Sequence, residues 1–135
     1  MGFNLIEENG YKYIEEGEGF PIIILHGLMG NLSNFNEVTD FFKKKNCKVI
    51  MPVLPIYDLP ILKTSVKELA KFVDKFILHK KIIDFVLMGN SLGGHIGLYY
   101  TKIFNKAKGL VLTGSSGLYE KGMGSGYTKR GDYEV

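Results

Sequence analysis

Residues 83–96 read IDFVLMGNSLGGHI, and this stretch decides the fold. Its first part, Ile83–Met88, is a nearly continuous apolar run, which is typical of a strand covered on both faces of a mostly parallel sheet. Gly89 ends this run, and we predict a helix from about Leu92 to Phe104. The stretch therefore predicts a buried strand that turns at once into a helix.

The same alternation of strand and helix extends over most of the chain. Residues 3–16 surround Asn9-Gly10, a dipeptide that favours a type I′ turn, and predict two antiparallel strands. Further strands are predicted at 21–25, 49–53 and 110–113. Strands separated by helices imply right-handed crossovers, so we expect an α/β fold. Its architecture would be a three-layer sandwich with a mostly parallel sheet and a leading antiparallel hairpin.

Two further helices are predicted from capping signals and apolar spacing. The first begins at Asn34, with Glu37 as its capping-box partner, and ends in a lysine cluster at 43–45. The second begins at Ser65 with Glu68 as partner, and its apolar residues recur at helical spacing as far as Ile77. The face of the first helix predicted to be apolar consists of Phe35, Val38, Phe41 and Phe42.

Composition limits the function classes. The chain has 135 residues, 45% of them hydrophobic, which fits one small domain or part of one. Its formal charge of +3 comes from scattered lysines, so we expect no nucleic-acid partner and no membrane partner. Cys47 is the only cysteine, and no signal sequence is recognisable, so the sequence predicts a cytoplasmic protein. We divide it into a domain at 1–114 and a glycine-rich tail at 115–135, where a lid region would begin.

The chemistry-bearing motif is Gly89-Asn90-Ser91-Leu92-Gly93, which fits G-x-S-x-G between a strand and a helix. A serine at such a turn has a strained backbone, and flanking residues without Cβ avoid a clash. Ser91 is the candidate nucleophile because the turn exposes its hydroxyl at the carboxyl end of the sheet. The Leu92 amide, at the start of the helix, is the first candidate donor to an oxyanion.

A second motif follows an earlier predicted strand. The segment His26-Gly27-Leu28-Met29-Gly30 is placed to supply the other oxyanion donor, for which the Leu28 amide is the candidate. We expect His26 to orient the backbone of this loop rather than to move protons. His26, Gly27, Gly89, Asn90 and Gly93 are thus supporting residues of the candidate site.

These two motifs together resemble the α/β-hydrolase superfamily, and in particular its esterases and related acyl hydrolases. The resemblance covers roughly residues 10–114, in the element order of that superfamily. It implies a serine hydrolase that cleaves an ester or related carbonyl compound through an acyl-enzyme at Ser91, with no cofactor and no metal. The implied partner is a small acyl substrate. Carbon–carbon bond hydrolysis and acyl transfer use the same groups and stay open.

The remaining triad members are not evident. In the superfamily an acid and then a histidine follow the nucleophile, but His95 lies one helical turn after Ser91 and Asp132 follows no predicted strand. His79 ends a predicted helix, where a positive charge would interact favourably with the negative end of the helix dipole. We therefore expect the N-terminal portion of a longer hydrolase, nearly inactive as this chain. Its open sheet edge could promote self-association.

Two other functions compete with the hydrolase hypothesis. A glycine-rich turn that opens a helix also binds anions, so a nucleotide- or phosphate-binding domain is one alternative. The segment matches neither G-x-G-x-x-G nor G-x-x-x-x-G-K-[ST], which disfavours it. The other alternative is a non-catalytic binding module that has kept a hydrolase-like fold.

Overall fold

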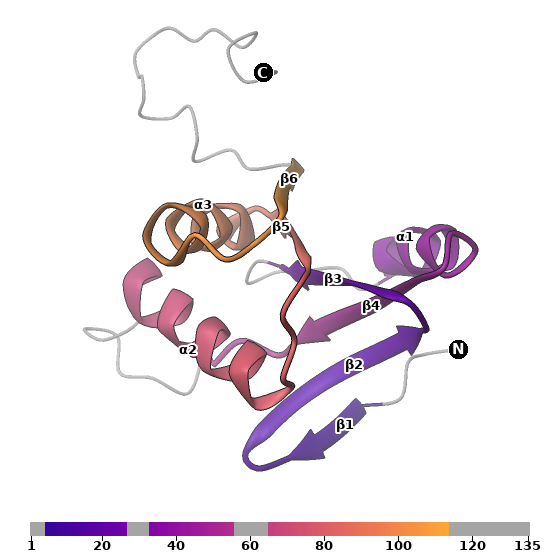
Figure 1. Cartoon of the computed structure of the whole chain (residues 1–135), viewed down its shortest axis with the longest axis horizontal. Coiled ribbons are helices and arrows are strands. Elements are labelled where there is room, and N and C mark those ends of the chain that lie inside the picture. The colour runs from indigo at the N-terminus through magenta and orange to yellow at the C-terminus, as the bar shows by residue number, and fades with distance from the viewer. Residues whose placement is uncertain (1–4, 27–32, 56–64, 114–135) are drawn as a thin grey trace, which may run out of the picture.

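The computed structural model describes residues 5–26, 33–55 and 65–113, with side chains omitted for 33–35 (Figure 1). The described residues form one six-stranded sheet in the order β1-β2-β4-β3-β5-β6. Its strands are β1 (Leu5–Glu8), β2 (Tyr11–Gly17), β3 (Phe20–Leu25), β4 (Cys47–Pro52), β5 (Val86–Asn90) and β6 (Gly109–Thr113). Its helices are α1 (Ser33–Lys43), α2 (Val66–His79) and α3 (Leu92–Phe104). The predicted tail at 115–135 lies outside the described residues.

Strand directions confirm a mostly parallel sheet with a leading hairpin. β1 pairs with β2 and β2 with β4 in antiparallel fashion, whereas β4–β3, β3–β5 and β5–β6 are parallel. The hairpin turn has positive φ at both central residues, 50° at Asn9 and 84° at Gly10, as a type I′ turn requires. Asparagine and glycine tolerate these angles better than other residues, which explains why the predicted turn forms here.

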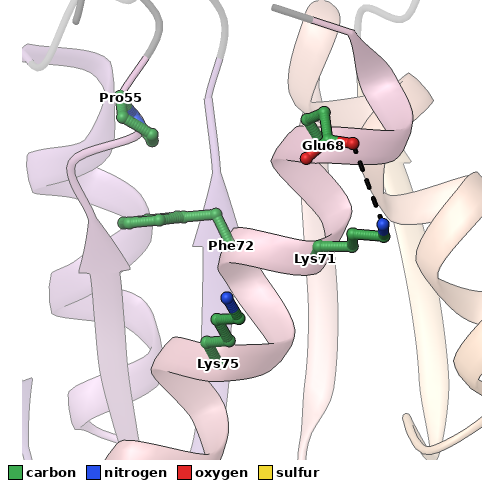
Figure 2. Close-up of a pocket in the computed structure, with 5 residues that line it drawn as sticks. All are labelled: Pro55, Glu68, Lys71, Phe72 and Lys75. Atoms are coloured by element: carbon green, nitrogen blue, oxygen red, sulfur yellow. Dashed lines mark ion pairs between the residues drawn. The ribbon is translucent and has the colours of Figure 1, made fainter. Parts of the chain in front are cut away.

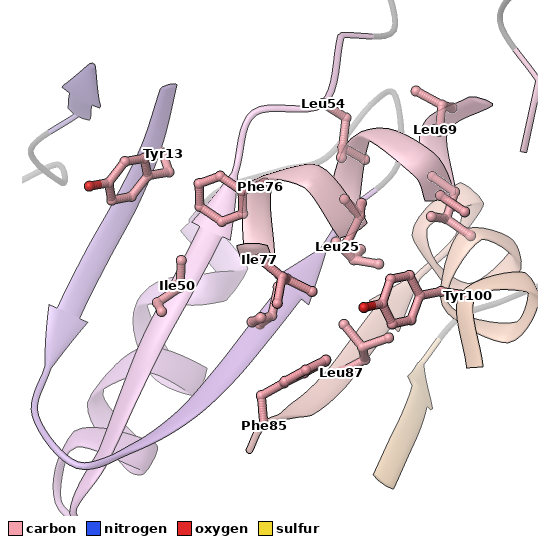
Figure 3. Close-up of a cluster of buried hydrophobic side chains, with 14 residues drawn as sticks. Tyr13, Leu25, Ile50, Leu54, Leu69, Phe76, Ile77, Phe85, Leu87 and Tyr100 are labelled. Carbon is pink, nitrogen blue, oxygen red and sulfur yellow. The ribbon is translucent and has the colours of Figure 1, made fainter. Parts of the chain in front are cut away.

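The two faces of the sheet are covered by different helices. Along β3, Ile23 and Leu25 face a core shared with α2 and α3, while Ile22 and Ile24 face a smaller core beside α1. Figure 3 shows the larger core, in which Leu69, Phe76 and Ile77 of α2 and Tyr100 of α3 pack against strand residues. Burying each large apolar side chain contributes about 1.5–3 kcal/mol, so this strand has to be apolar on both sides. The predicted three-layer sandwich is thereby confirmed.

A buried polar contact joins α2 to α3. The Tyr100 hydroxyl donates to Asp74 Oδ1 at 2.8 Å, and the Lys106 ammonium donates to the same oxygen at 3.0 Å. Burial, together with the bond to the carboxylate, raises the pKa of Tyr100 well above its usual value. The helix that follows Ser91 is therefore fixed laterally by a bond that sequence patterning did not predict.

The strand before the candidate nucleophile differs from the prediction at both ends. It begins at Val86 rather than Ile83, and it continues through Gly89 to Asn90. Ile83 is 78% exposed because it lies in the connection after α2, where Lys81 already has a positive φ of 59°. The predicted strand began too early because the apolar run continues into the connection, and apolar residues alone do not show where a connection ends and a strand begins.

Smaller corrections concern the first helix and the fourth strand. α1 begins at Ser33, one residue before the predicted start. Phe41 is 54% exposed, whereas Val38 and Phe42 of the same predicted face are partly buried. β4 spans Cys47–Pro52, so Cys47 belongs to the strand and exposed Val53 does not. The predicted capping contact at the start of α1 and the Phe35 side chain lie outside the described residues.

Candidate active site

Ser91 occupies the junction between β5 and α3 in an unusual backbone conformation. Its φ is 58° and its ψ is −122°, a region that costs a non-glycine residue about 1–3 kcal/mol. The turn is closed by a hydrogen bond from the Gly94 amide to the Ser91 carbonyl at 2.9 Å. Ser91 is exposed, and its side chain makes no capping hydrogen bond to α3. Ser91 is thus exposed at the turn and uncommitted to capping α3, while its role as nucleophile stays a prediction.

The flanking glycines are required by backbone contacts. A Cβ at Gly89 would contact the Gly93 carbonyl oxygen and lie 2.7 Å from Gly94 Cα. A Cβ at Gly93 would overlap the Leu25 carbonyl and lie 2.9 Å from the His26 nitrogen. Real Cβ atoms do not approach backbone this closely, so the predicted need for glycine at both positions has a specific steric cause.

The same close packing brings His26, the first residue of the second motif, to the start of α3. Because Gly93 lies directly on Leu25 and His26, the start of α3 abuts the end of β3. The parallel register pairs Leu25 with Gly89, so the loop after β3 and the turn at Ser91 leave the sheet at the same edge. His26 is half-buried at this edge. Gly27 and Leu28 lie outside the described residues, so the second oxyanion donor stays a prediction.

The start of α3 supplies a favourable field beside Ser91. Leu92 is the first residue of the helix, so its amide precedes the internal hydrogen bonding of α3. The first turn of α3 contains no acidic residue, and Lys102 lies in the last turn. The partial positive charge of the helix start is therefore not neutralised within its own first turn.

Asn90 has a partner that sequence reasoning missed. The Thr113 hydroxyl donates to Asn90 Oδ1 at 3.2 Å, where these two residues are paired at the ends of β5 and β6. Thr113 was predicted only as the end of a strand. The predicted parallel sheet contained a hint of this contact, because pairing β6 beside β5 places the last residue of β6 next to the residue before Ser91.

The three histidines lie apart from one another: His26 follows β3, and the other two belong to helices. His79 ends α2, and its Nε2 lies 3.0 Å from Glu8 Oε1 in the hairpin. Hydrogen bonds from His79 and from Tyr13 lower the pKa of Glu8 below its usual value. His95 is half-buried within α3, one helical turn beyond Ser91. Asp132 lies outside the described residues.

A shallow hollow of about 300 Å³ lies along α2 and was not predicted from the sequence (Figure 2). The Phe72 ring extends toward Pro55 at one side, and an exposed ion pair joins Lys71 to Glu68 at 3.8 Å. None of its lining residues belongs to the predicted site; they are Pro55, Glu68, Lys71, Phe72 and Lys75.

Within residues 5–26, 33–55 and 65–113, no three His, Cys, Asp or Glu side chains are grouped as metal ligands. Over the same part of the chain, no helix has the length and apolar character needed to cross a bilayer.

Solved structures resemble this chain over most of its length. MGS-MChE2, an α/β hydrolase enzyme from the metagenome of sediments of the Mar Chica lagoon in Morocco, is 51% identical, with a TM-score of 0.81. That match covers 87% of this chain and 54% of the other. The N-acyl homoserine lactonase AidH, complexed with N-butanoyl homoserine, is 27% identical, with a TM-score of 0.67 over 85% of this chain and 45% of its own.

A curated relative and a family model agree with these structures. A Mycoplasma genitalium protein whose name describes an esterase/lipase is 32% identical over 95 residues, which are 67% of this chain and 35% of that protein. The chain thus spans about a third to a half of the length of these relatives. The family model for the alpha/beta hydrolase fold matches residues 21–127. With the sheet order and the strand–turn–helix at Ser91, these matches show that the chain belongs to the α/β hydrolase fold family.

Proposed function

We propose that Ser91 is the nucleophile of a serine hydrolase that cleaves small esters. The observation that carries this proposal is the conformation of Ser91, which is strained, exposed and without a capping bond at the start of α3. A serine with a purely structural role at a helix start would adopt extended angles and cap the helix. Strain that the surrounding contacts maintain is typical of functional sites.

In the proposed reaction, Ser91 Oγ attacks the carbonyl carbon of the ester while a histidine accepts its proton. The tetrahedral oxyanion is held by the Leu92 amide and, in this proposal, by the Leu28 amide. The bond from the carbonyl carbon to the alkoxy oxygen then breaks, and the histidine returns the proton to the leaving alcohol. Water, deprotonated by the same histidine, next attacks the acyl-enzyme; the bond from the carbonyl carbon to Ser91 Oγ breaks, the histidine returns the proton to Oγ, and the acid is released.

The positions of the described histidines restrict the choice of base. His79 is bonded to Glu8 at the end of α2, whereas Ser91 follows the carboxyl end of β5. His95 belongs to the helix that Ser91 opens, so its side chain is poorly directed for accepting the serine proton. His26, the remaining histidine of the sequence, precedes Ser91, whereas the family's triad has its histidine after the nucleophile. We therefore assign the base to a histidine other than these three, C-terminal to Ser91 in the full-length protein.

The substrate class follows from the surroundings of the nucleophile and from the relatives. Leu92 is apolar, and the uncompensated helix start favours the developing negative charge of an ester's oxyanion. The relatives include an esterase/lipase and a lactonase, both named for the cleavage of carbonyl–oxygen bonds. We therefore propose an uncharged carboxylic ester as substrate.

Covalent labelling tests the proposal. A fluorophosphonate should label Ser91, and the site of modification is read by peptide mass spectrometry. Ser91→Ala should remove the label, while Ser65→Ala, which alters another serine at a helix start, should retain it. Labelling at other residues, or none in the full-length protein, contradicts the proposal. A nucleotide-binding domain would instead bind ATP in a titration and leave the fluorophosphonate unreacted.

A further inference from the structure

A hydrogen-bonded pair lies at the carboxyl edge of the sheet beside the candidate nucleophile. Asn90 directly precedes Ser91, and its Oδ1 accepts from the Thr113 hydroxyl at 3.2 Å. The two residues are Cα partners in the parallel β5–β6 register, so their side chains leave the same face of the sheet. The bond therefore favours one orientation of the Asn90 amide, in the residue directly before the candidate nucleophile.

This bond uses the acceptor of the Asn90 amide and leaves its donor. With Oδ1 engaged by Thr113, the two hydrogens on Nδ2 remain, and no hydrogen bond joins Nδ2 to another described residue. Asn90 is half-buried, so part of its side chain is open to solvent or substrate. A donor that no described residue uses, on the residue directly before the candidate nucleophile, is available to recognise a polar atom of the substrate.

The described neighbours of the pair are partly exposed. Residues alternate between faces along a strand, so Asn90 shares a face with Met88, and Thr113 shares that face with Val111. Met88 packs near α1, but Val111 is 42% exposed and Thr113 is exposed. Among the described residues, this corner of the sheet is therefore less covered than the strands beside it.

We propose that Asn90 is a specificity-determining residue and that Thr113 positions it. Asn90 Nδ2 donates to an acceptor oxygen in the acyl part of the substrate, close to the scissile carbonyl. The preferred substrates are then esters with an ether, hydroxyl or carbonyl oxygen near that carbonyl, rather than plain alkanoyl esters. This inference rests on the proposed function, because it assumes that Ser91 attacks the adjacent carbonyl carbon.

A matched pair of substrates isolates this contact. The p-nitrophenyl esters of methoxyacetic acid and butyric acid have acyl chains of the same length and differ by one ether oxygen in place of a methylene. The acylation rate of Ser91 in the full-length protein is measured for both, from nitrophenol release and from the mass of the acylated peptide. The ratio of the two rates for a variant, divided by that for the unaltered chain, cancels their intrinsic reactivities.

Three substitutions should change this ratio. Asn90→Leu and Asn90→Asp both remove the donor, and each should lower the preference for the methoxyacetyl ester about three- to tenfold, as expected for one neutral hydrogen bond. Asn90→Asp retains an acceptor for Thr113, so it serves if Asn90→Leu does not fold. Thr113→Val keeps the shape of the side chain but frees the Asn90 amide to rotate. It should lower the preference about two- to threefold, and Thr113→Ser should restore it.

The possible outcomes separate this inference from the proposed function. If the Asn90 and Thr113 variants slow both esters equally, the pair is only a structural tie between β5 and β6, and the inference is overturned while Ser91 stays the nucleophile. If fluorophosphonate does not label Ser91 in the unaltered protein, the proposed function fails first and the inference falls with it. Ser65→Ala serves as the control for general destabilisation, and its ratio should equal that of the unaltered chain.

Discussion

In the described part of the chain, two serines directly precede the first residue of a helix, and they have opposite roles. Ser65 has φ of −120° and ψ of 164°, and its Oγ accepts a hydrogen bond from the Glu68 amide at 3.1 Å. Ser91 has φ of 58° and ψ of −122° and makes no capping bond. The first arrangement stabilises its helix, whereas the second costs stability. The same residue type at the same structural position therefore serves folding in α2 and leaves a hydroxyl available in α3.

The neighbours of each serine explain the difference. α2 has Glu68 in its first turn, where a carboxylate favours the positive end of the helix dipole. α3 has Gly93 and Gly94 there, and no acidic residue. Glycine lets the first turn of α3 lie against the end of β3, and the missing carboxylate leaves the helix start able to stabilise an anion. The first turn of α3, which lies at the candidate site, is thus stabilised less by its own residues than the first turn of α2.

The largest expected effect comes from breaking the packing that holds Ser91 in its conformation. Gly93→Ala would push a methyl group into the Leu25 carbonyl, so β3 and α3 would have to separate. We expect a loss of unfolding free energy of about 3 kcal/mol, measured by urea denaturation followed by circular dichroism.

Gly97→Ala is the matched control within the same helix. A Cβ at Gly97 meets only the end of the flexible Leu110 side chain, at 2.9 Å, and alanine favours the helix interior. Its unfolding free energy should therefore change by less than about 1 kcal/mol in either direction. Equal losses for the two alanine variants would show that Gly93 has no special contact with β3.

Substituting the two serines should change stability in opposite directions. Ser91→Gly relieves a backbone strain of about 1–3 kcal/mol, but glycine makes the unfolded chain more flexible, which offsets part of this relief. We therefore expect the unfolding free energy to rise by about 1 kcal/mol. Ser65→Ala removes a capping bond, and we expect a loss of about 1 kcal/mol. Both values come from the same denaturation experiment, in which Ser91→Gly should also fail to react with fluorophosphonate. A Ser91→Gly variant less stable than the unaltered chain would mean that the hydroxyl supports the fold.

Local patterns predicted those parts of the fold that depend on neighbours along the chain. The Asn9-Gly10 turn, the cap at Ser65 and the strand–turn–helix around Ser91 follow from backbone preferences over a few residues. Ile83 was placed in a strand because an apolar run does not show where a connection ends. Phe41 was placed in the core because a helix period does not show how wide the covered face is.

Contacts between distant segments could not be predicted in this way. The bond from Tyr100 to Asp74 depends on how α3 lies on α2, and the bond from Thr113 to Asn90 depends on the register of β6. The candidate nucleophile was found because one pentapeptide contains it. Thr113, which bonds to Asn90 directly before that serine, was not found, since 22 residues separate Thr113 from Asn90 in the sequence and only the sheet brings them together.

The smallest expected effect concerns the other end of α2, where Glu8 holds the hairpin to the helix. Hydrogen bonds from His79 and Tyr13 lower the pKa of Glu8 below 4.5, so its contribution to stability is complete above that pH and is lost as the pH falls through the lowered value. When the pH is lowered from about 6 to about 3.5, the melting temperature of Glu8→Gln should therefore fall less than that of the unaltered chain. Because Glu8 is exposed, the difference should be small, and Ser65→Ala should leave the pH dependence unchanged. Parallel pH profiles for Glu8→Gln and the unaltered chain would mean that the contact between Glu8 and His79 does not stabilise the fold, and that the contacts of Lys80 with Glu15 and Tyr13 hold this end of α2 to the hairpin without it.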